Sequence, residues 1–184
     1  PGEKDPDRLL RTVIRPAFLE FRLVDERNNE LIDSATGNLR AGASLPPGTE
    51  LVDAKLADFN KETQKIEYKN TKMVVLKRAY VTGDQLRNAS VTYNPSDFQN
   101  PIQVALEFNP QGAAEFAKVT TEYAGSNRLL AIMLDKVVRS APRINDPITD
   151  GRAVITGGFS NEEANDLSQL LKAGSIKAPL DRKS

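Results

Sequence analysis

The chain of 184 residues contains neither cysteine nor histidine. Thiol nucleophiles, thiolate zinc sites, imidazole bases and imidazole metal ligands are therefore excluded, and with them most common active sites. Long apolar runs are also missing. The longest, residues 129–134, is far shorter than the roughly 20 residues of a membrane-spanning helix, and the N-terminus shows no signal peptide. We expect no transmembrane segment in this chain.

The chain has no excess charge of either sign, because its 25 basic and 25 acidic residues cancel and are interspersed along the sequence. Such a protein lacks the strong field that would hold the phosphates of a nucleic acid or an anionic membrane surface. We therefore expect no nucleic-acid partner.

The N-terminal residues predict one helix and one strand. Asp5 and Pro6 supply an N-cap and a first helical position, and Pro16 ends the helix. Residues 18–24, FLEFRLV, then alternate apolar and charged side chains, which predicts a strand with one polar face.

Residues 33–72 differ in character from their surroundings. They are polar and are interrupted by Gly-Asn and Pro-Pro-Gly. We interpret them as an inserted, projecting head-like subdomain on a base formed by residues 1–32 and 73–184. The apolar residues of the insertion form either a small core of their own or a contact surface for a partner. The candidates for contact are Leu45, Leu51, Val52, Leu56 and Phe59.

The residues after the insertion predict further strands and one clear helix. Residues 73–81 have strand character, and we expect Asp84 to cap a short helical segment, with a polar loop after it. Residues 102–108, IQVALEF, alternate cleanly. Asn109 and Pro110 start a helix that Gly125 ends.

The last part of the chain predicts a hairpin, a strand and a capped helix. Two apolar runs within residues 129–142 are separated by Asp135-Lys136, which is hairpin spacing, and residues 151–158 supply another strand. Ser160 and Glu163 form a capping box, and we expect this helix to close at Lys172 with Gly174 as its C-cap.

The order of these elements from residue 102 is strand, helix, strand, strand, helix. This order predicts the α+β class, with a ferredoxin-like (split βαβ) base, a mainly antiparallel sheet and helices on one face. An open edge of residues 73–81 or 102–108 would be able to add an extended peptide by backbone hydrogen bonds.

Three groups of residues are candidates for chemistry, and each has a simpler explanation. Asp135 beside Lys136 is an acid next to a base, but it fits an exposed turn better. Asp146 and Asp150 offer oxygen ligands without the spacing of a calcium loop. The glycines of TGGFSNEEA precede a helix, where a structural cap is favoured over an anion site. We expect no catalytic residue, cofactor or metal.

A set of ordered matches connects the sequence with a known family. They include Leu130-Ala131-Ile132, Leu134-Asp135, Ser140-Ala141-Pro142, Gly157, Phe159, Glu163-Ala164 and Ala173-Gly174. In this order they resemble the large extracytoplasmic domain of the SecD family of bacterial protein-export membrane subunits. The resemblance covers nearly all of the chain except residues 33–72. Lys136 departs from the family, which commonly has Gly or Asn there, as a type I′ turn prefers.

The resemblance implies a function. It predicts a non-enzymatic domain on the periplasmic side of the bacterial inner membrane, with SecF, the SecYEG channel and unfolded translocating polypeptide as partners. It implies coupling of export to the proton motive force, through proton-carrying residues in membrane helices outside this chain. It also implies that an N-terminal part of the base is missing here. Two alternatives remain: a scaffold that docks partner subunits, and a soluble enzyme that uses Asp135, Asp146 and Asp150.

Overall fold

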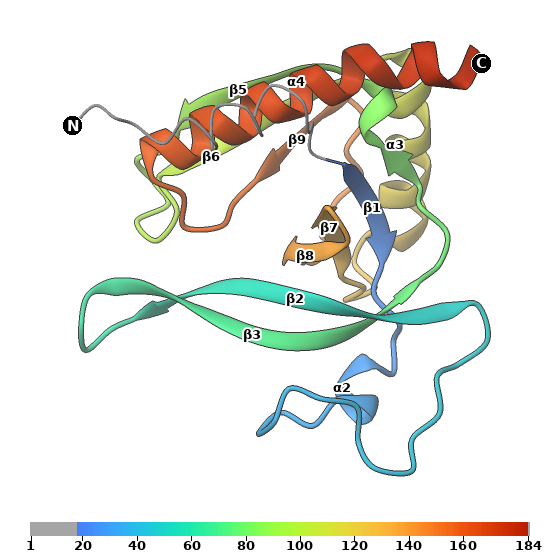
Figure 1. The fold of residues 1–184 in the computed structure, drawn as a ribbon, viewed down its shortest axis with the longest axis vertical. Coiled ribbons are helices and arrows are strands. Elements are labelled where there is room, and N and C mark those ends of the chain that lie inside the picture. Colours follow the sequence, from blue (N-terminus) through green and yellow to red (C-terminus); the bar gives the residue numbers. More distant parts are fainter. Residues whose placement is uncertain (1–17, 184) are drawn as a thin grey trace.

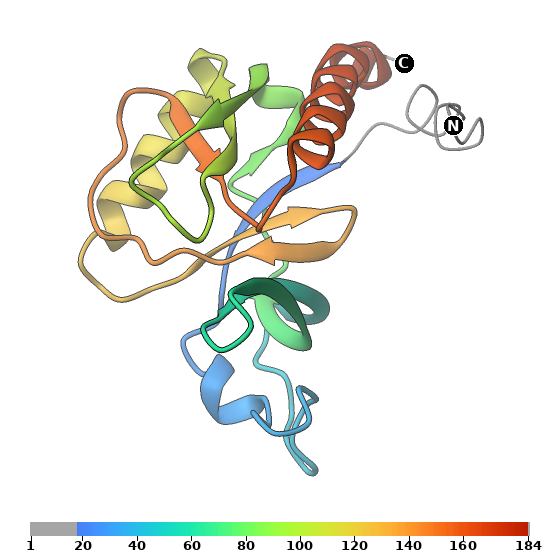
Figure 2. The ribbon, with the colours of Figure 1, turned by 90° about the vertical axis from the view of Figure 1, so that its left-hand side faces the viewer.

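The computed structural model describes residues 18–183, and for residues 175–183 it describes the helical backbone alone (Figure 1). The helix predicted over residues 5–16 lies outside the described residues. Two sheets form most of the fold. Figure 2 shows helix α4 beside the smaller sheet, and the β2–β3 hairpin below the β7–β8 hairpin.

The larger sheet has six strands in the order β3-β2-β8-β7-β1-β4. All neighbouring strands in it are antiparallel except β2 and β8, which are parallel. The predicted mainly antiparallel sheet is therefore confirmed. The strands of this sheet are β1 (Leu19–Leu23), β2 (Thr49–Asn60), β3 (Lys65–Leu76), β4 (Val81–Thr82), β7 (Leu130–Leu134) and β8 (Val137–Ser140).

The smaller sheet has three antiparallel strands in the order β5-β6-β9. Helix α4 lies along β5 and β6, and helix α3 stands beside them, nearer to β1 (Figure 1). The short helix α2 lies against β3. These elements are β5 (Leu86–Tyr93), β6 (Ile102–Phe108), β9 (Arg152–Ile155), α2 (Asn28–Leu31), η1 (Gly83–Gln85), α3 (Pro110–Tyr123) and α4 (Asn161–Lys183).

The main core fills the space between the two sheets. Phe21 of β1, Phe108 of β6 and Phe116 of α3 form a ring cluster with centroid distances of 5.1 to 5.6 Å. Strand β7 contributes side chains to two cores, because alternate residues of a strand point to opposite faces. Ile132 packs in the main core, and Met133 packs in a second core under the β2–β3 hairpin.

The α+β class is confirmed, but the ferredoxin-like arrangement is not. Strands β6 and β9 pair in the smaller sheet, whereas β7 and β8 belong to the larger one. The reason is the pairing of β1, which runs along the whole of β7 from Leu19↔Leu134 to Leu23↔Leu130. This pairing draws β7 into the larger sheet and away from β6.

The polar face of β1 is buried. The Glu20 carboxylate pairs with the Arg22 guanidinium at 2.9 Å, and Glu50 of β2 approaches the same guanidinium at 3.2 Å. Burial by itself would lower the pKa of Arg22, but hydrogen bonds and charge attraction from Glu20 and Glu50 outweigh it and raise that pKa. The ion pair between Arg22 and Glu50 thus joins β1 to the start of the β2–β3 hairpin.

Residues 73–93 contain three corrections. The expected strand 73–81 is two strands, because β3 ends at Leu76 and β4 begins at Val81 on the opposite edge of the same sheet. The expected cap at Asp84 is wrong: Thr82 is the N-cap of η1, and its N–H donates to the Gln85 side chain at 3.1 Å.

The third correction is strand β5, whose residues the sequence interpretation assigned to a turn with a short helical segment and to the polar loop after it. A register shift between Leu86 and Asn88 breaks the strict alternation of the strand, so the buried positions Leu86 and Ala89 are three residues apart. A bulged strand of this kind lacks the period-2 signal.

The expected starts of α3 and α4 are confirmed. The Asn109 side chain accepts from Gly112 N–H at 2.8 Å, and Ser160 and Glu163 form the reciprocal capping box at 3.0 and 3.1 Å. Helix α3 ends before Gly125 as predicted, but the predicted end of α4 at Gly174 is wrong, because the helix continues to Lys183. A glycine inside a helix costs only about 1 kcal/mol, so Gly174 alone does not end it.

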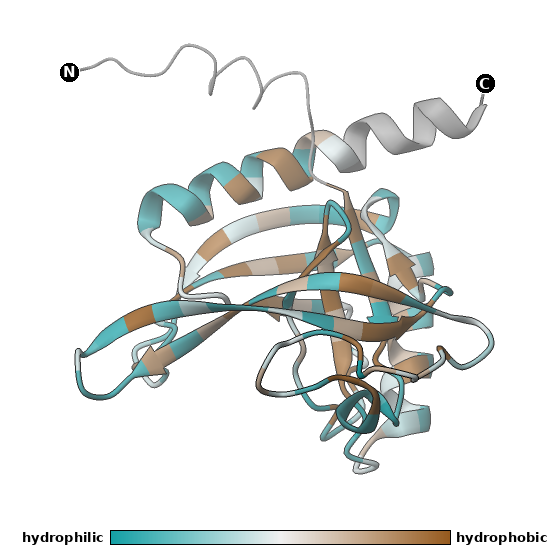
Figure 3. Ribbon diagram, turned by 60° about the horizontal axis from the view of Figure 1, so that its bottom comes forward, coloured by the Kyte–Doolittle hydropathy of each residue, from teal (hydrophilic) through white to brown (hydrophobic). Residues whose placement is uncertain are grey.

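The β2–β3 hairpin belongs to the larger sheet. Strand β3 crosses the proposed boundary at residue 72, and its partner β2 pairs with β8 through Asp53↔Val137 and Ala54↔Val138. The hairpin is apolar near β1 and hydrophilic at its turn (Figure 3). The division of the chain into a base and an inserted head stays a prediction.

Candidate functional site

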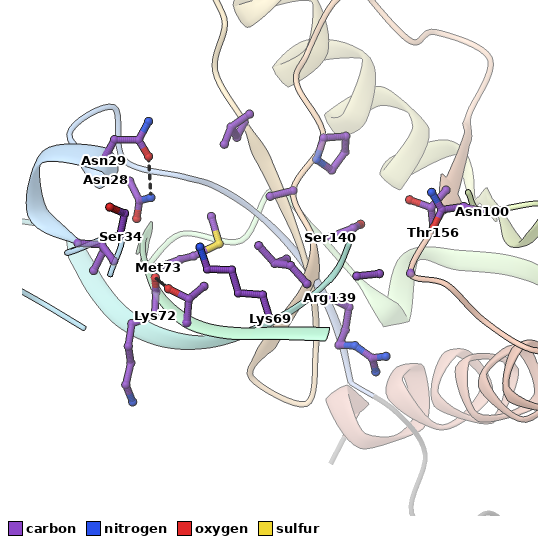
Figure 4. Close-up of a pocket in the computed structure, with 18 of the residues that line it drawn as sticks. Asn28, Asn29, Ser34, Lys69, Lys72, Met73, Asn100, Arg139, Ser140 and Thr156 are labelled. Carbon is purple, nitrogen blue, oxygen red and sulfur yellow. Dashed lines mark hydrogen bonds between the residues drawn. The ribbon is translucent and has the colours of Figure 1, made fainter. Parts of the chain in front are cut away.

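A cleft opens where β2 and β8 separate. In the described part of the chain, these strands pair only up to Ala54↔Val138. Beyond this pair, residues 139–142 face a cavity of about 730 Å³ instead of a neighbouring strand. The opposite wall is the face of the hairpin that carries Leu56 and Lys69, which are cross-strand partners. Figure 4 shows this cleft with α2 at one end and Asn100 and Thr156 at the other.

The lining of the cleft combines apolar and uncharged polar groups with four cationic residues, and no acidic residue among those described lines it. The apolar lining residues are Ile32, Leu56, Ala57, Met73, Leu129, Ala141 and Pro142. The cationic ones are Arg40, Lys69, Lys72 and Arg139.

Two of the four cations are already paired. Lys72 Nζ lies 2.6 Å from Asp53, and an Arg40 nitrogen lies 3.9 Å from Asp33. The backbone N–H groups of Ala35 and Thr36 donate to Asp33 and lower the pKa of its carboxyl group.

The other two cations, Lys69 and Arg139, have no ion pair with any residue that the structure describes. In Figure 4 the Lys69 side chain extends over the cleft towards Met73, whereas Lys72 points outwards. The Arg139 guanidinium lies 5.9 Å from the Phe159 ring, in a cation–π contact. Positive charge is therefore available in the cleft at Lys69 above all.

Strand β8 also carries two buried polar atoms without a hydrogen-bond partner, Arg139 Nε and Ser140 Oγ. Both residues line the cleft. A buried polar atom that lacks a partner costs about 1–3 kcal/mol, and native proteins contain few of them. Both atoms are enclosed by the protein, so neither is open to a ligand in the cleft.

The far end of the cleft is closed by contacts between the hairpin and residues 156–158. The Tyr68 hydroxyl donates to the carbonyl oxygens of Gly157 at 3.1 Å and Gly158 at 3.3 Å. Burial raises the pKa of Tyr68, the nearby Glu163 raises it further, and Arg139 opposes the shift.

The two glycines of TGGFSNEEA serve this close packing. Gly158 has a φ of +67°, and a Cβ atom there would lie 2.5 Å from Ile66 Cγ2. Its N–H donates to the Asn100 side chain at 3.0 Å and is therefore not free for an anion.

The turn at Asp135-Lys136 is confirmed. Asp135 has a φ of 51° and Lys136 a φ of 71°, as a two-residue type I′ turn requires, so Lys136 keeps the turn that Gly or Asn would favour. The Asp135 carboxylate accepts from Phe18 N–H at 2.9 Å, and Asp135 N–H donates to Phe18 O at 3.0 Å. Asp135 thus extends the pairing of β1 with the β7–β8 hairpin by one residue beyond the end of β7.

The three aspartates proposed for an enzyme do not share a site. Asp135 lines a cavity of about 400 Å³ beside α4, and Asp146 lines another of about 320 Å³ beside α3. Asp150 accepts from Arg152 N–H at 3.2 Å in a turn. Within residues 18–174, where side chains are described, no group of three or more acidic residues is placed to hold a metal ion.

The five proposed contact residues lie in different environments. Val52 is buried in the second core and Leu51 packs against a third cluster around α2, on the opposite face of β2. Phe59 is partly buried, and Leu45 is 37% exposed on the loop before β2. Leu56 alone of the five lines the cleft. The burial of Leu51 and Val52 supports the alternative that the apolar residues form a core.

The sequence interpretation missed Lys69, Arg139 and Ser140 as cleft residues. One signal for them was available. Ser140-Ala141-Pro142, part of the ordered family matches, is the same segment that lines the cleft where β8 leaves β2.

No helix in the described range has both the length and the apolarity that a membrane crossing requires.

Comparison with known proteins places the chain beside protein-export components. Residues 57–178 match the family model described as SecDF, P1 head subdomain. The protein translocase subunit SecD of Desulfurispirillum indicum is 39% identical over 98% of this chain and 32% of its own length. The SecD subunit of Magnetococcus marinus is 36% identical over 98% of this chain and 31% of its own length. The chain thus spans about a third of the length of these curated relatives.

Two solved structures are similar over 97% of the chain. One is described as a membrane component SecDF that enhances protein export; it has a TM-score of 0.60 at 29% identity, and the match covers 73% of its chain. The other, SecDF in a super-membrane-facing form, has a TM-score of 0.62 at 31% identity, and the match covers 22% of its chain.

Proposed function

Because the chain belongs to the SecD family of protein translocase subunits, we propose that it is a periplasmic domain that binds and guides a translocating polypeptide in the cleft between the β2–β3 hairpin and β8. The observation that carries the proposal is the separation of β2 from β8 after Ala54↔Val138. It leaves the last two residues of β8, Arg139 and Ser140, and the segment 141–142 that follows them along a cavity.

The chemistry of the cleft supports an extended chain as its occupant. Adding a strand to a free strand edge satisfies backbone groups without regard to side-chain identity, which suits a protein that must accept many polypeptides. The apolar lining, with Leu56 and Met73, favours burial of occasional apolar side chains.

The remainder of the proposed function concerns the whole subunit. We propose that this domain binds polypeptide while membrane segments outside the chain, together with SecF and the SecYEG channel, couple export to the proton motive force. The small share of the relatives' length that the chain spans supports this division of labour. The domain itself acts without catalysis.

An export assay tests the proposal in cells that depend on the full-length subunit. Leu56→Ser removes apolar surface from the cleft, and we expect it to slow pulse-chase export of a secreted protein. Leu56→Met keeps that surface and should export normally. Leu45→Ser serves as the comparison outside the cleft. Slower export in this variant alone would place the contact with polypeptide on the loop before β2 instead. Normal export in both serine variants would refute polypeptide contact at these residues.

A scaffold function is the second candidate, favoured by one exposed loop. Phe98 is 90% exposed and Tyr93 is 68% exposed. Hydrogen bonds within the loop between β5 and β6 hold the segment that carries Phe98. The Asp97 carboxylate accepts from Asn100 N–H at 3.0 Å and from the Gln103 side chain at 3.3 Å. A preorganised aromatic side chain is typical of a protein–protein contact.

Phe98→Ser distinguishes this second function. A scaffold predicts loss of co-purifying translocase subunits with unchanged crosslinking to polypeptide, whereas unchanged co-purification would count against it.

A further inference from the structure

The charge of the residues that line the cleft indicates which class of ligand it favours. Among the described residues, its lining includes four cationic side chains and no carboxylate, although the whole chain has equal numbers of acidic and basic residues. Lys72 and Arg40 are paired with acids that do not line the cleft, whereas Lys69 has no such partner within the described ranges. The Arg139 guanidinium points towards α4 (Figure 4), where a second cavity is lined by Asp135, Glu163 and Asp166. Lys69 is thus the cation of the cleft that favours an anionic ligand.

The wall opposite Lys69 includes the end of β8. Arg139 and Ser140 lie there, and their Nε and Oγ atoms are enclosed by the protein. Lys69, which is exposed, is therefore the charged group that a ligand in the cleft can reach.

The spacing of charge and apolar surface fits an extended chain. Leu56 and Lys69 are directly opposite each other on the two strands of the hairpin, and Met73 follows Lys69 on the same face of β3 because the positions are an even number apart. Apolar and cationic groups thus lie side by side along one wall. An extended segment presents every second side chain on one face, so a carboxylate and an apolar side chain that are an even number of residues apart reach this wall together.

We infer that the cleft prefers extended polypeptide segments in which carboxylate side chains accompany apolar ones, with Lys69 as the main determinant of this preference. The inference rests on the proposed function, since it names the class of segment that the same cleft selects. Charge complementarity commits the cleft to an acidic polypeptide. The strand edge at the end of β8, residues 139–140, favours a peptide over a lipid headgroup, which has no backbone to pair with it.

Equilibrium binding to the full-length subunit, held in nanodiscs of zwitterionic lipid, tests the inference. The probes are three labelled peptides that share the same apolar residues and carry Glu, Gln or Lys at positions an even number of residues away from them, on the same face of the extended peptide. An exposed ion pair with Lys69 is weak, so we expect the Glu peptide to bind about 1.4- to fivefold more tightly than the Gln peptide. The Lys peptide should bind most weakly, and added salt should reduce the differences.

Two matched variants assign the preference to the cleft. Lys69→Gln should remove most of the advantage of the Glu peptide over the Gln peptide. Lys65→Gln makes the same change on the same strand at an exposed position that is not part of the cleft lining, and it should preserve that advantage. Unfolding curves of both variants should match the parent.

The other outcomes overturn the inference in distinguishable ways. Equal binding of the three peptides would remove the charge preference and leave the proposed function standing. Binding of none of them would remove both. An advantage that survives Lys69→Gln would place the preference outside the cleft. Lys69-dependent binding of phosphatidylglycerol vesicles without peptide binding would identify a lipid headgroup as the ligand.

Discussion

At the scale of single residues, positive φ angles allow one tight turn and one close backbone contact in this fold. Asp135 and Lys136 form the β7–β8 turn, and Gly158 brings the segment before α4 against Ile66 of the hairpin. The left-handed conformation is unfavourable for a residue that has a Cβ atom, so the lysine carries a cost that the glycine avoids.

Lys136→Gly should stabilise the protein. The left-handed conformation costs a non-glycine residue about 1–2 kcal/mol, and the substitution removes this cost. Glycine also makes the unfolded chain more flexible, which offsets part of the gain, so we expect the free energy of unfolding to rise by about 0.5–1 kcal/mol. Urea unfolding measures it. Lys118→Gly, at an exposed position inside α3, should instead lose about 1 kcal/mol. A loss of stability in Lys136→Gly would contradict the turn geometry.

Gly158→Ala should destabilise the protein through a clash as well as through its φ angle. The new Cβ atom would lie 2.5 Å from Ile66 Cγ2. Overpacking of this kind costs about 1–3 kcal/mol in addition to the cost of the left-handed backbone. Gly42 is the matched control, because it has a φ of +80° with no atom within 4 Å of its Cβ position. Similar losses in thermal unfolding of both variants would show that the contact with Ile66 is unimportant.

At the scale of elements, the β2–β3 hairpin is the part that builds the site, and it is held at three places. Its base is tied to β1 by the ion pairs of Arg22, its middle pairs with β8, and its outer half is fastened by Tyr68 to residues 157–158. The cleft lies between the second and third of these attachments.

Tyr68→Phe should loosen the outer attachment of the hairpin. Loss of the hydroxyl contacts costs about 1 kcal/mol at neutral pH. The folded state raises the pKa of Tyr68 above its usual 10.0, so the folded protein holds this proton more tightly than the unfolded chain does. The stabilising effect is therefore complete below pH 10 and falls as the pH rises through the folded-state pKa. The difference in unfolding free energy between parent and variant should shrink over that range, and a constant difference would contradict the argument.

How far the sequence predicts these elements depends on how local their signals are. The alternation in β1 and β6 and the caps at Asn109 and Ser160 are local signals, and the elements they predict are present. Strand β5 was missed because its bulge disrupts the alternation. The helix end expected at Gly174 failed because a single glycine is a weak stop signal.

The candidate site was harder to predict because its residues are far apart in the sequence. The parallel pairing of β2 with β8 joins residues 53–54 to residues 137–138, and no local pattern specifies where such a pairing ends. Leu56 was predicted as a contact from its apolar character alone. Lys69 and Ser140 gain their importance only from the cleft that this pairing leaves open.

At the scale of the whole molecule, a protein without net charge has a cleft whose described lining contains cations and no carboxylate. The net charge is zero, yet no described acidic residue lines the cavity of about 730 Å³. Such a distribution favours local recognition over long-range attraction, because distant charges of both signs cancel each other beyond a Debye length. It fits a domain that contacts a polypeptide delivered to it by other subunits.

Site-specific crosslinking during translocation tests the central claim, that a translocating polypeptide occupies the cleft. The chain contains no cysteine, so Leu56→Cys supplies a single thiol in the cleft and Lys118→Cys supplies one on the exposed face of α3. Each is placed in the full-length subunit, in a form without other cysteines, with a secreted precursor arrested in the channel. We predict crosslinks to the precursor from position 56 and none from position 118. Equal crosslinking from both positions, or none from position 56, would contradict the account.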